Sequence, residues 1–291
     1  MGMSAIAVPI TIASSDDVGR GLRDGGLAQR GGADLIEWRI DQLAAQASGP
    51  DAAETLVRQG PLPCILTCRS TDEGGAFAGI EAERVGLLDQ LATRDAIPAY
   101  IDVEYARWIA SSDLQDVTAA LRARGAKVIL SAHDFSGRPE NLDDIFRNID
   151  EAGGSDVTKV AWLAETVADV SICAAKIRQR PRETIALCMG EIGIVTRVFA
   201  GAWGGLLTFA ALSSGQASAP GQPTLEEMIT VYRIRAIDAA TQLRPVFRQG
   251  STLDENATLR QAGKNTVALA LGPVTDEDAA LEELRVLIEN R

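Results

Sequence analysis

The stretch KVILSAHDFSGRPENLDDIFRNIDEAGGSDVTKVAWL, residues 127–163, holds one complete repeat of the pattern that decides the fold. An apolar segment at 128–132 is followed by the amphipathic segment ENLDDIFRNIDEA and by a second apolar segment at 157–162. Short apolar runs are typical of buried strands, and the amphipathic segment is typical of a surface helix. Strand, helix and strand in succession predict two parallel strands joined by a crossover helix.

The same alternation runs along most of the chain. Eight apolar segments recur, and helix-patterned stretches separate most of them. Eight strand–helix units predict an α/β fold of the (β/α)8, or TIM-barrel, type over residues 1–245. No GxGxxG follows the first segment, which counts against a dinucleotide-binding fold. The segments span residues 5–12, 35–40, 64–68, 100–103, 128–132, 157–162, 184–189 and 206–212.

The C-terminal part follows a different pattern. A last helix at about 224–243 is expected to complete the barrel. Residues 246–291 then form a short β-α extension of unknown role. Its strand is NTVALALG, and its helix is the acidic, amphipathic segment DEDAALEELRVLIEN.

Composition limits the possible functions. The chain has 291 residues, with 28 Lys and Arg against 40 Asp and Glu, so its formal net charge is -12. This balance argues against nucleic-acid binding and against adhesion to acidic membranes. No leader or membrane span is evident, and the four cysteines are expected to be buried thiols, which indicates a cytoplasmic protein. A single histidine, His133, rules out a histidine-rich metal site.

Polar and charged side chains alternate with apolar ones near the ends of five predicted strands. Strands of a barrel are buried on both faces, so these charges must be paired or used in function. They gather at the C-terminal ends of the strands, where barrel enzymes build their active sites. The residues are Glu37, Arg39, Asp41, Thr67, Arg69, Tyr100, Asp102, Glu104, Ser131, His133 and Lys159.

Three of these positions suit acid–base and covalent chemistry. Lys159 lies in the apolar strand VTKVAWL, where burial favours the neutral amine that attacks a ketone and forms a Schiff base. A neutral His133 could remove a proton next to that imine and later protonate a leaving hydroxyl. Glu73 in TCRSTDEGG could orient the imidazole. The alternatives are a paired strand-end lysine, a structural histidine and a solvated loop carboxylate.

Taken together, the motifs resemble the type I 3-dehydroquinate dehydratase (3-dehydroquinase) family. This resemblance implies a (β/α)8 barrel that forms a homodimer and needs no metal and no cofactor. It also implies a lyase that dehydrates 3-dehydroquinate to 3-dehydroshikimate by syn elimination through a lysine Schiff base, the third step of the shikimate pathway. The motifs, in the family's order, are EWRID at 37–41, TCRSTDEGG at 67–75, DVE at 102–104, SAHDF at 131–135, VTK at 157–159, MGEIGIVTR at 189–197, TFA at 208–210 and SAPGQ at 218–222.

The resemblance also implies a role for individual residues. Lys159 forms the imine, His133 moves the protons and Glu73 supports His133. Two further groups are expected to bind substrate: Arg197, Ser218 and Gln222 at the carboxylate and the adjacent hydroxyl, and Glu37, Arg39 and Arg69 at the ring hydroxyls and pocket charges. Two other readings stay open, a Schiff-base aldolase that cleaves carbon–carbon bonds and a non-catalytic ligand-binding relative.

Overall fold

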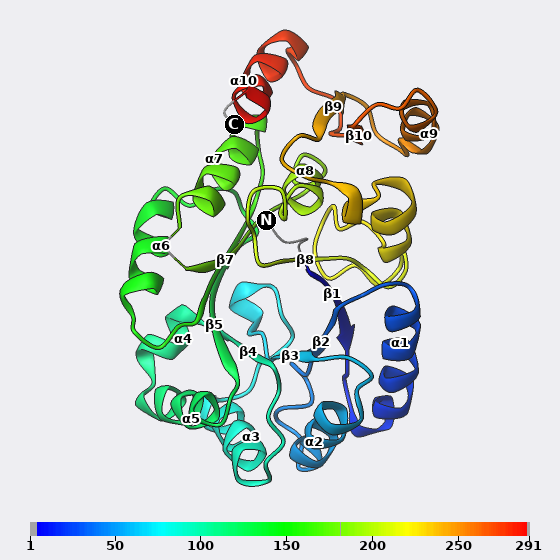
Figure 1. Cartoon of the computed structure of the whole chain (residues 1–291). Coiled ribbons are helices and arrows are strands. Elements are labelled where there is room, and N and C mark those ends of the chain that lie inside the picture. Colours follow the sequence, from blue (N-terminus) through cyan, green and yellow to red (C-terminus); the bar gives the residue numbers. More distant parts are fainter. Residues whose placement is uncertain (1–4, 181, 290–291) are drawn as a thin grey trace. The chain divides into compact units, whose positions relative to one another are not determined.

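A computed structural model describes residues 5–180 and 182–289, with side chains described up to residue 285. Eight strands follow one another in the order β7-β6-β5-β4-β3-β2-β1-β8, and the pairs from β1 to β5 are parallel (Figure 1). Each of the eight predicted segments overlaps one strand, so the expected α/β fold of the (β/α)8, or TIM-barrel, type is confirmed. The strands are β1 (Ala5–Thr11), β2 (Leu35–Arg39), β3 (Cys64–Thr67), β4 (Tyr100–Glu104), β5 (Lys127–Asp134), β6 (Val157–Leu163), β7 (Glu183–Met189) and β8 (Leu207–Phe209).

Helices separate these strands. At the N-termini of two of them, a side chain accepts a backbone N–H that has no partner within the helix. Ser111 accepts a hydrogen bond from the backbone N–H of Leu114, and Asp169 accepts one from Thr166. Among the described residues, no helix is long and apolar enough to cross a bilayer. The helices are α1 (Val18–Arg30), α2 (Gly49–Gln59), α3 (Glu81–Thr93), α4 (Tyr105–Ala110), α5 (Ser112–Ala123), α6 (Leu142–Glu151), α7 (Val167–Arg178) and α8 (Ile194–Val198).

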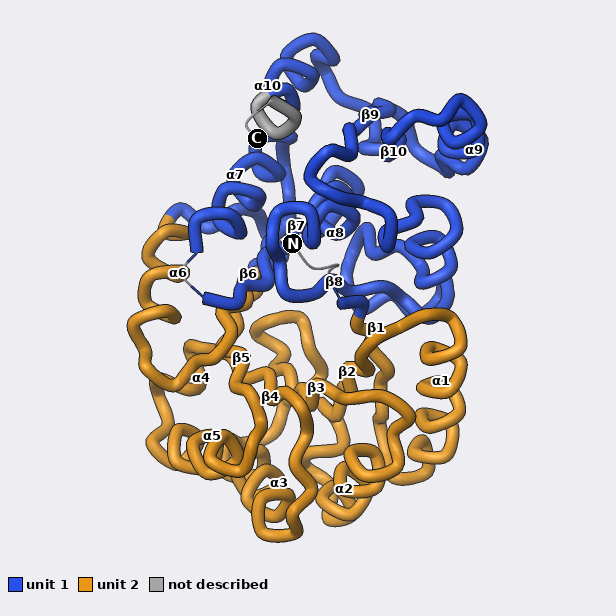
Figure 2. Tube along the Cα trace, viewed as in Figure 1, with its two compact units in different colours: residues 1–6, 134–140, 161–291 blue, residues 7–133, 141–160 orange. Residues whose placement is uncertain are grey.

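The chain divides into two compact units (Figure 2). Unit 2 comprises residues 7–133 and 141–160 and contains most of β1 and β5, strands β2 to β4, the start of β6 and helices α1 to α6. Unit 1 contains the described residues of 1–6, 134–140 and 161–291. All four cysteines are buried and free, as predicted.

In unit 2, the largest fully buried side chain is Trp38 of β2. Glycines leave room for its indole ring: a Cβ built on Gly21, Gly25 or Gly60 would lie within 3.6 Å of it. Gly21 and Gly25 are one helical turn apart in α1, so they present a flat face toward β2. Core packing around Trp38 therefore depends on small residues in the neighbouring helix.

In unit 1, the C-terminal extension is larger than predicted. The predicted strand and helix are present as β10 (Thr266–Ala270) and α10 (Glu277–Glu289). Two elements escaped prediction, β9 (Gln242–Val246), which pairs in parallel with β10, and the connecting helix α9 (Leu253–Gln261). The extension is therefore β-α-β-α, while its limits as a domain, 246–291 after a 1–245 catalytic domain, stay a prediction.

The prediction of a long helix at about 224–243 was wrong. The structure has a five-residue π-helix, η3 (Glu227–Val231), and a short 3-10 helix, η4 (Ile234–Ala236). Arg233 between them adopts a left-handed conformation with φ 51°, which ends a right-handed helix. Further on, the Asp238 carboxylate accepts hydrogen bonds from the Ala240 N–H and the Thr241 hydroxyl, and such local bonds compete with helix formation.

Two adjacent glycines of α1 test the packing around Trp38. A Cβ at Gly25 would lie 2.8 Å from Ile36 Cδ1, whereas the nearest atom to a Cβ at Gly26 is the mobile Arg30 Nη1 at 3.4 Å. Gly25→Ala overpacks the core, which costs about 1–3 kcal/mol. In either variant the alanine stabilises the helix by at most about 1 kcal/mol, because its helix propensity is higher than that of glycine. Urea unfolding should therefore find Gly26→Ala more stable than Gly25→Ala by about 1–3 kcal/mol. Equal stabilities would show that α1 has room to shift.

Candidate active site

Lys159 in β6 lies in the interior of unit 2, with 5% of its surface exposed. Its Nζ is 2.6 Å from Asp102 Oδ2 and 3.8 Å from Glu37 Oε1. Two carboxylates therefore lie close to the amine of this buried side chain. This lysine is thus held by an ion pair, and a positive charge that forms on its nitrogen is already matched by a negative one.

Asp102 of β4 joins Lys159 to Arg69. Arg69 Nη2 donates to Asp102 Oδ1 over 2.6 Å, and the Ser131 hydroxyl donates to the same oxygen over 2.6 Å. Burial alone would raise the pKa of Asp102, but the Arg69 and Lys159 cations hold it well below its usual range. Asp102 is therefore a permanent anion between two cations.

A histidine–carboxylate pair lies in the same unit. His133 Nδ1 is 2.9 Å from Glu73 Oε2. Glu73 ends the 3-10 helix η2 (Thr71–Glu73), and Gly74 turns the chain with φ 75°. Gly75 allows a close approach, because a Cβ there would lie 2.1 Å from the Arg69 carbonyl oxygen. The TDEGG sequence thus folds Glu73 back over the end of β3.

Burial sets the charge state of this pair. It lowers the pKa of His133 well below the ordinary value of 6.5, and the Arg69 and Lys159 cations lower it further. Burial also raises the pKa of Glu73 to about 7, with Glu104 and Asp102 adding to the effect of burial. A neutral His133 that donates its Nδ1–H to the ionised Glu73 leaves Nε2 unprotonated. This is the form that a general base requires.

Glu104 of β4 holds the loop that carries Glu73. Its Oε1 accepts a hydrogen bond from the Ser70 N–H over 2.5 Å, and its Oε2 accepts one from Arg84 Nη1 over 2.5 Å. Arg84 belongs to helix α3 and also donates to the Cys68 carbonyl oxygen over 2.8 Å. An outer helix therefore fixes a carboxylate of the inner site.

The remaining predicted residues of unit 2 form a second group of charges. Arg39 makes a bidentate contact with Asp41, with distances of 3.2 and 2.7 Å. The Asp41 carboxylate in turn accepts the backbone N–H of Arg69 over 3.0 Å. Glu37 accepts a hydrogen bond from the Thr67 hydroxyl over 2.9 Å. Every one of these buried carboxylates has a hydrogen-bond donor, as buried charge requires.

Unit 1 contains the other three predicted residues. Arg197 in α8 is 2% exposed, burial lowers its pKa to about 10, and its Nε has no partner among the described residues. Gln222 Oε1 accepts from the Ser218 N–H and hydroxyl over 2.7 and 3.0 Å, and its Nε2 is buried without a described partner. The Gly190 N–H donates to the Pro220 carbonyl over 3.0 Å, which ties this loop to β7. Buried donors of this kind suit an anionic or hydroxylated ligand.

The structure thus brings six predicted residues together in unit 2: Lys159, His133, Glu73, Glu37, Arg39 and Arg69. Arg197, Ser218 and Gln222 lie in unit 1. Sequence reasoning placed Asp102 and Glu104 on the polar face of their strand but gave neither a role. The DVE motif with its period of two was the available signal, and only the ion pairs across β4, β3 and β6 show what the two carboxylates do.

Three comparisons relate the chain to known proteins. A family model described as Type I 3-dehydroquinase matches residues 6–239. The chloroplastic bifunctional 3-dehydroquinate dehydratase/shikimate dehydrogenase of Arabidopsis thaliana is 31% identical over 275 residues, covering 92% of this chain and 44% of the relative. The 3-dehydroquinate dehydratase of Methanosarcina barkeri is 35% identical over 215 residues, covering 71% of this chain and 87% of the relative.

A solved structure is similar as well. The crystal structure of 3-dehydroquinate dehydratase from Geobacillus kaustophilus matches with a TM-score of 0.68 at 26% identity, covering 79% of this chain and 90% of that one. The chain spans less than half the length of the bifunctional relative. The match to the bifunctional relative covers 92% of this chain. The predicted barrel makes up a smaller share, 245 of 291 residues, so the match includes part of the extension.

The ion pairs of Asp102 predict a large effect on stability. Asp102→Asn removes the negative charge between Lys159 and Arg69, and an uncompensated buried charge costs about 3–5 kcal/mol. Asp72→Asn is the matched control, because Asp72 is an exposed partner of Arg107 whose loss should cost less than about 1 kcal/mol. Urea unfolding at pH 7 measures both values. Similar small losses for the two variants would mean that water compensates the charges of Lys159 and Arg69.

Proposed function

The chain belongs to the type I 3-dehydroquinase family, and we propose that it dehydrates 3-dehydroquinate to 3-dehydroshikimate through an imine on Lys159. This activity makes the chain a lyase of the shikimate pathway, which leads to the aromatic amino acids. The observation that carries the imine is the position of Lys159. The chain has four lysines, and Lys159 alone is buried, with Asp102 at 2.6 Å.

Imine formation is the first step. An amine attacks through its lone pair, so the Lys159 ammonium first gives up one proton, and the neutral Nζ then attacks the ketone carbon of the substrate. The ketone oxygen takes up the released proton and one proton from Nζ and leaves as water. The protonated imine that results carries a positive charge on Nζ, which Asp102 matches as it matches the ammonium of the free enzyme. A cationic imine withdraws electrons, so a proton on the adjacent carbon becomes acidic.

Elimination is the second step. His133 Nε2 takes that proton, and the electron pair of the C–H bond moves into the imine to give an enamine. The enamine then expels the hydroxyl group one carbon further on, which leaves as water with the proton from His133. One base that serves both transfers works from one face of the ring, which gives syn elimination. Hydrolysis of the imine releases the product and restores Lys159.

Substrate binding is assigned to the other predicted residues. Arg197, with Ser218 and Gln222, is proposed to bind the carboxylate and the adjacent hydroxyl, since a guanidinium matches a carboxylate through two parallel hydrogen bonds. Glu37, Arg39 and Arg69 are proposed to contact the ring hydroxyls and balance charge. The unpartnered Arg197 Nε and Gln222 Nε2 support the first assignment. No observation favours the aldolase or the non-catalytic relative over the dehydratase.

Two further features of the enzyme are proposals. Four free, buried cysteines support a reducing compartment, and the cytoplasm is the one proposed. A homodimer is proposed from the family resemblance. Light scattering on the eluting protein measures that state, with twice the monomer mass expected and the mass of one chain as the contrary result.

Imine trapping tests Lys159 directly. Borohydride added with 3-dehydroquinate should fix one substrate to the chain, and peptide mapping should place it at Lys159 rather than at the exposed Lys127 or Lys264. Lys159→Ala should lose both the adduct and the rise in enone ultraviolet absorbance. His133→Ala should keep the adduct and slow product formation by about 100-fold or more. An adduct that persists in Lys159→Ala would assign the imine to another amine.

The pH profile tests the His133–Glu73 pair. The pKa of Glu73 is raised to about 7, so the carboxylate that supports His133 is ionised above that pH and protonated below it. Activity should therefore rise with pH through about 7 and fall roughly tenfold per unit on the acid side. Glu73→Gln should lower activity and remove this acid limb. An acid limb that survives in Glu73→Gln would show that another group controls it.

A further inference from the structure

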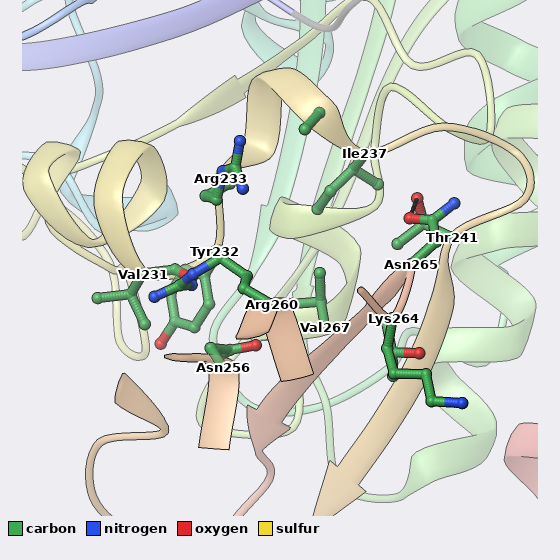
Figure 3. A pocket seen from close by; sticks show the side chains of 12 residues that line it. Val231, Tyr232, Arg233, Ile237, Thr241, Asn256, Arg260, Lys264, Asn265 and Val267 are labelled. Atoms are coloured by element: carbon green, nitrogen blue, oxygen red, sulfur yellow. Dashed lines mark hydrogen bonds between the residues drawn. The ribbon is translucent and has the colours of Figure 1, made fainter. Parts of the chain in front are cut away.

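A small pocket of about 70 Å³ opens in unit 1 next to the C-terminal extension (Figure 3). Its wall comes from the end of η3 and the turns after it, from Thr241 and from residues between 256 and 267, which include the end of α9 and the start of β10. Seven of the twelve lining residues follow residue 239, where the match to the family model ends. None of the twelve has a role in the proposed dehydration.

Positive charge distinguishes the wall of this pocket. Arg233, Arg260 and Lys264 line it, and no Asp or Glu does. The whole chain has 40 acidic against 28 basic residues, so three cations without a carboxylate depart from the average. At distances of a few Å, local charges outweigh a net charge that salt screens. The pocket is therefore suited to an anion.

Arg260 is the cation that the fold holds in place. Its Nη1 donates to the Val231 carbonyl oxygen over 3.0 Å, and Figure 3 shows the side chain reaching toward Val231 and Tyr232. A guanidinium has five N–H donors, and this is its one hydrogen bond within the described residues. The other donors can take part in pairing with an oxyanion. A side chain that is already positioned loses less entropy when it binds.

The other two cations also have capacity for a ligand. Neither the Arg233 nor the Lys264 side chain makes a hydrogen bond or an ion pair with another described residue, and both residues are exposed. The nearby Asp238 carboxylate accepts from Thr241 Oγ1 over 3.0 Å and from Asn265 Nδ2 over 3.3 Å. The Asp238 carboxylate thus accepts hydrogen bonds from Thr241 and Asn265 at the rim of the pocket rather than pairing with the three cations.

Apolar groups form the rest of the wall. Val231, Tyr232 and Val267 are buried, and Ile237 is half-buried. We propose that the pocket binds a small organic anion, with its carboxylate or phosphate group against Arg260 and Arg233 and a short apolar body against Ile237 and Val267. This binding site is additional to the dehydratase reaction and does not depend on it.

Methyl NMR of the full chain tests this site. The Val231, Ile237 and Val267 methyl groups report on the pocket itself, so binding there is separated from binding at the reaction site. Benzoate should shift these signals in a saturable titration. Benzamide, of the same shape without charge, and inorganic phosphate, without the apolar body, should each bind at least about tenfold more weakly.

Substitutions identify the groups that hold the anion. Arg260→Gln and Arg233→Gln should each weaken benzoate binding about tenfold. Arg244→Gln is the matched control on the exposed side of β9, outside the pocket, and should change binding by less than about twofold. If Arg260→Gln disturbs the methyl spectrum of the free protein, Arg260→Lys keeps the charge, and Arg233→Gln tests the site independently.

Three results would overturn the proposal. Benzamide that binds as tightly as benzoate would remove the role of charge. Phosphate that binds as tightly would remove the role of the apolar wall. Unchanged benzoate affinity in Arg260→Gln and Arg233→Gln, or shifts confined to methyl groups elsewhere, would show that this pocket does not bind the anion.

Discussion

The charge of Asp102 is the constraint on which the rest of the site depends. It is buried and accepts hydrogen bonds from Lys159, Arg69 and Ser131, so it joins β6, the segment after β3, and β5 through one carboxylate. A buried anion is tolerated only when such partners are fixed, and the partners are fixed because β3, β5 and β6 are. The parallel strands thus do more than support the site. They set the spacing at which Asp102 can pair with both Lys159 and Arg69 in the interior.

The Asp102 carboxylate is part of an arrangement in which two neighbouring groups have different charge states. Asp102 favours a cation at Lys159, whereas burial and two nearby cations keep His133 neutral. The proposed imine and the proposed base are therefore favoured by one arrangement of charges. Glu73, whose pKa is raised to about 7, connects this arrangement to the pH of the solution.

Sequence reasoning reached the eight strands and the polar residues along them because period two and period 3.6 are local properties. It failed where the outcome depends on partners. β9 has the sequence QLRPV, in which Pro245 and two polar residues hide a strand that is identified by its pairing with β10. The helix expected at 224–243 was ended by the left-handed Arg233, which no periodicity reveals. Asp102 and Glu104 were found as polar positions, but their roles lie in contacts with other strands.

Arg84 has a consequence for how freely parts of this fold can be exchanged. It belongs to helix α3 in the outer layer, yet its guanidinium bonds the inner carboxylate of Glu104 and the Cys68 carbonyl. A strand–helix unit of a (β/α)8 barrel is often regarded as a cassette whose helix can be replaced as long as its apolar face is kept. Here the third unit is not such a cassette. A transplanted helix without an arginine at this register would leave Glu104 with Arg69, at 3.8 Å, as its cation, and the carboxylate that accepts the Ser70 N–H would be held less firmly.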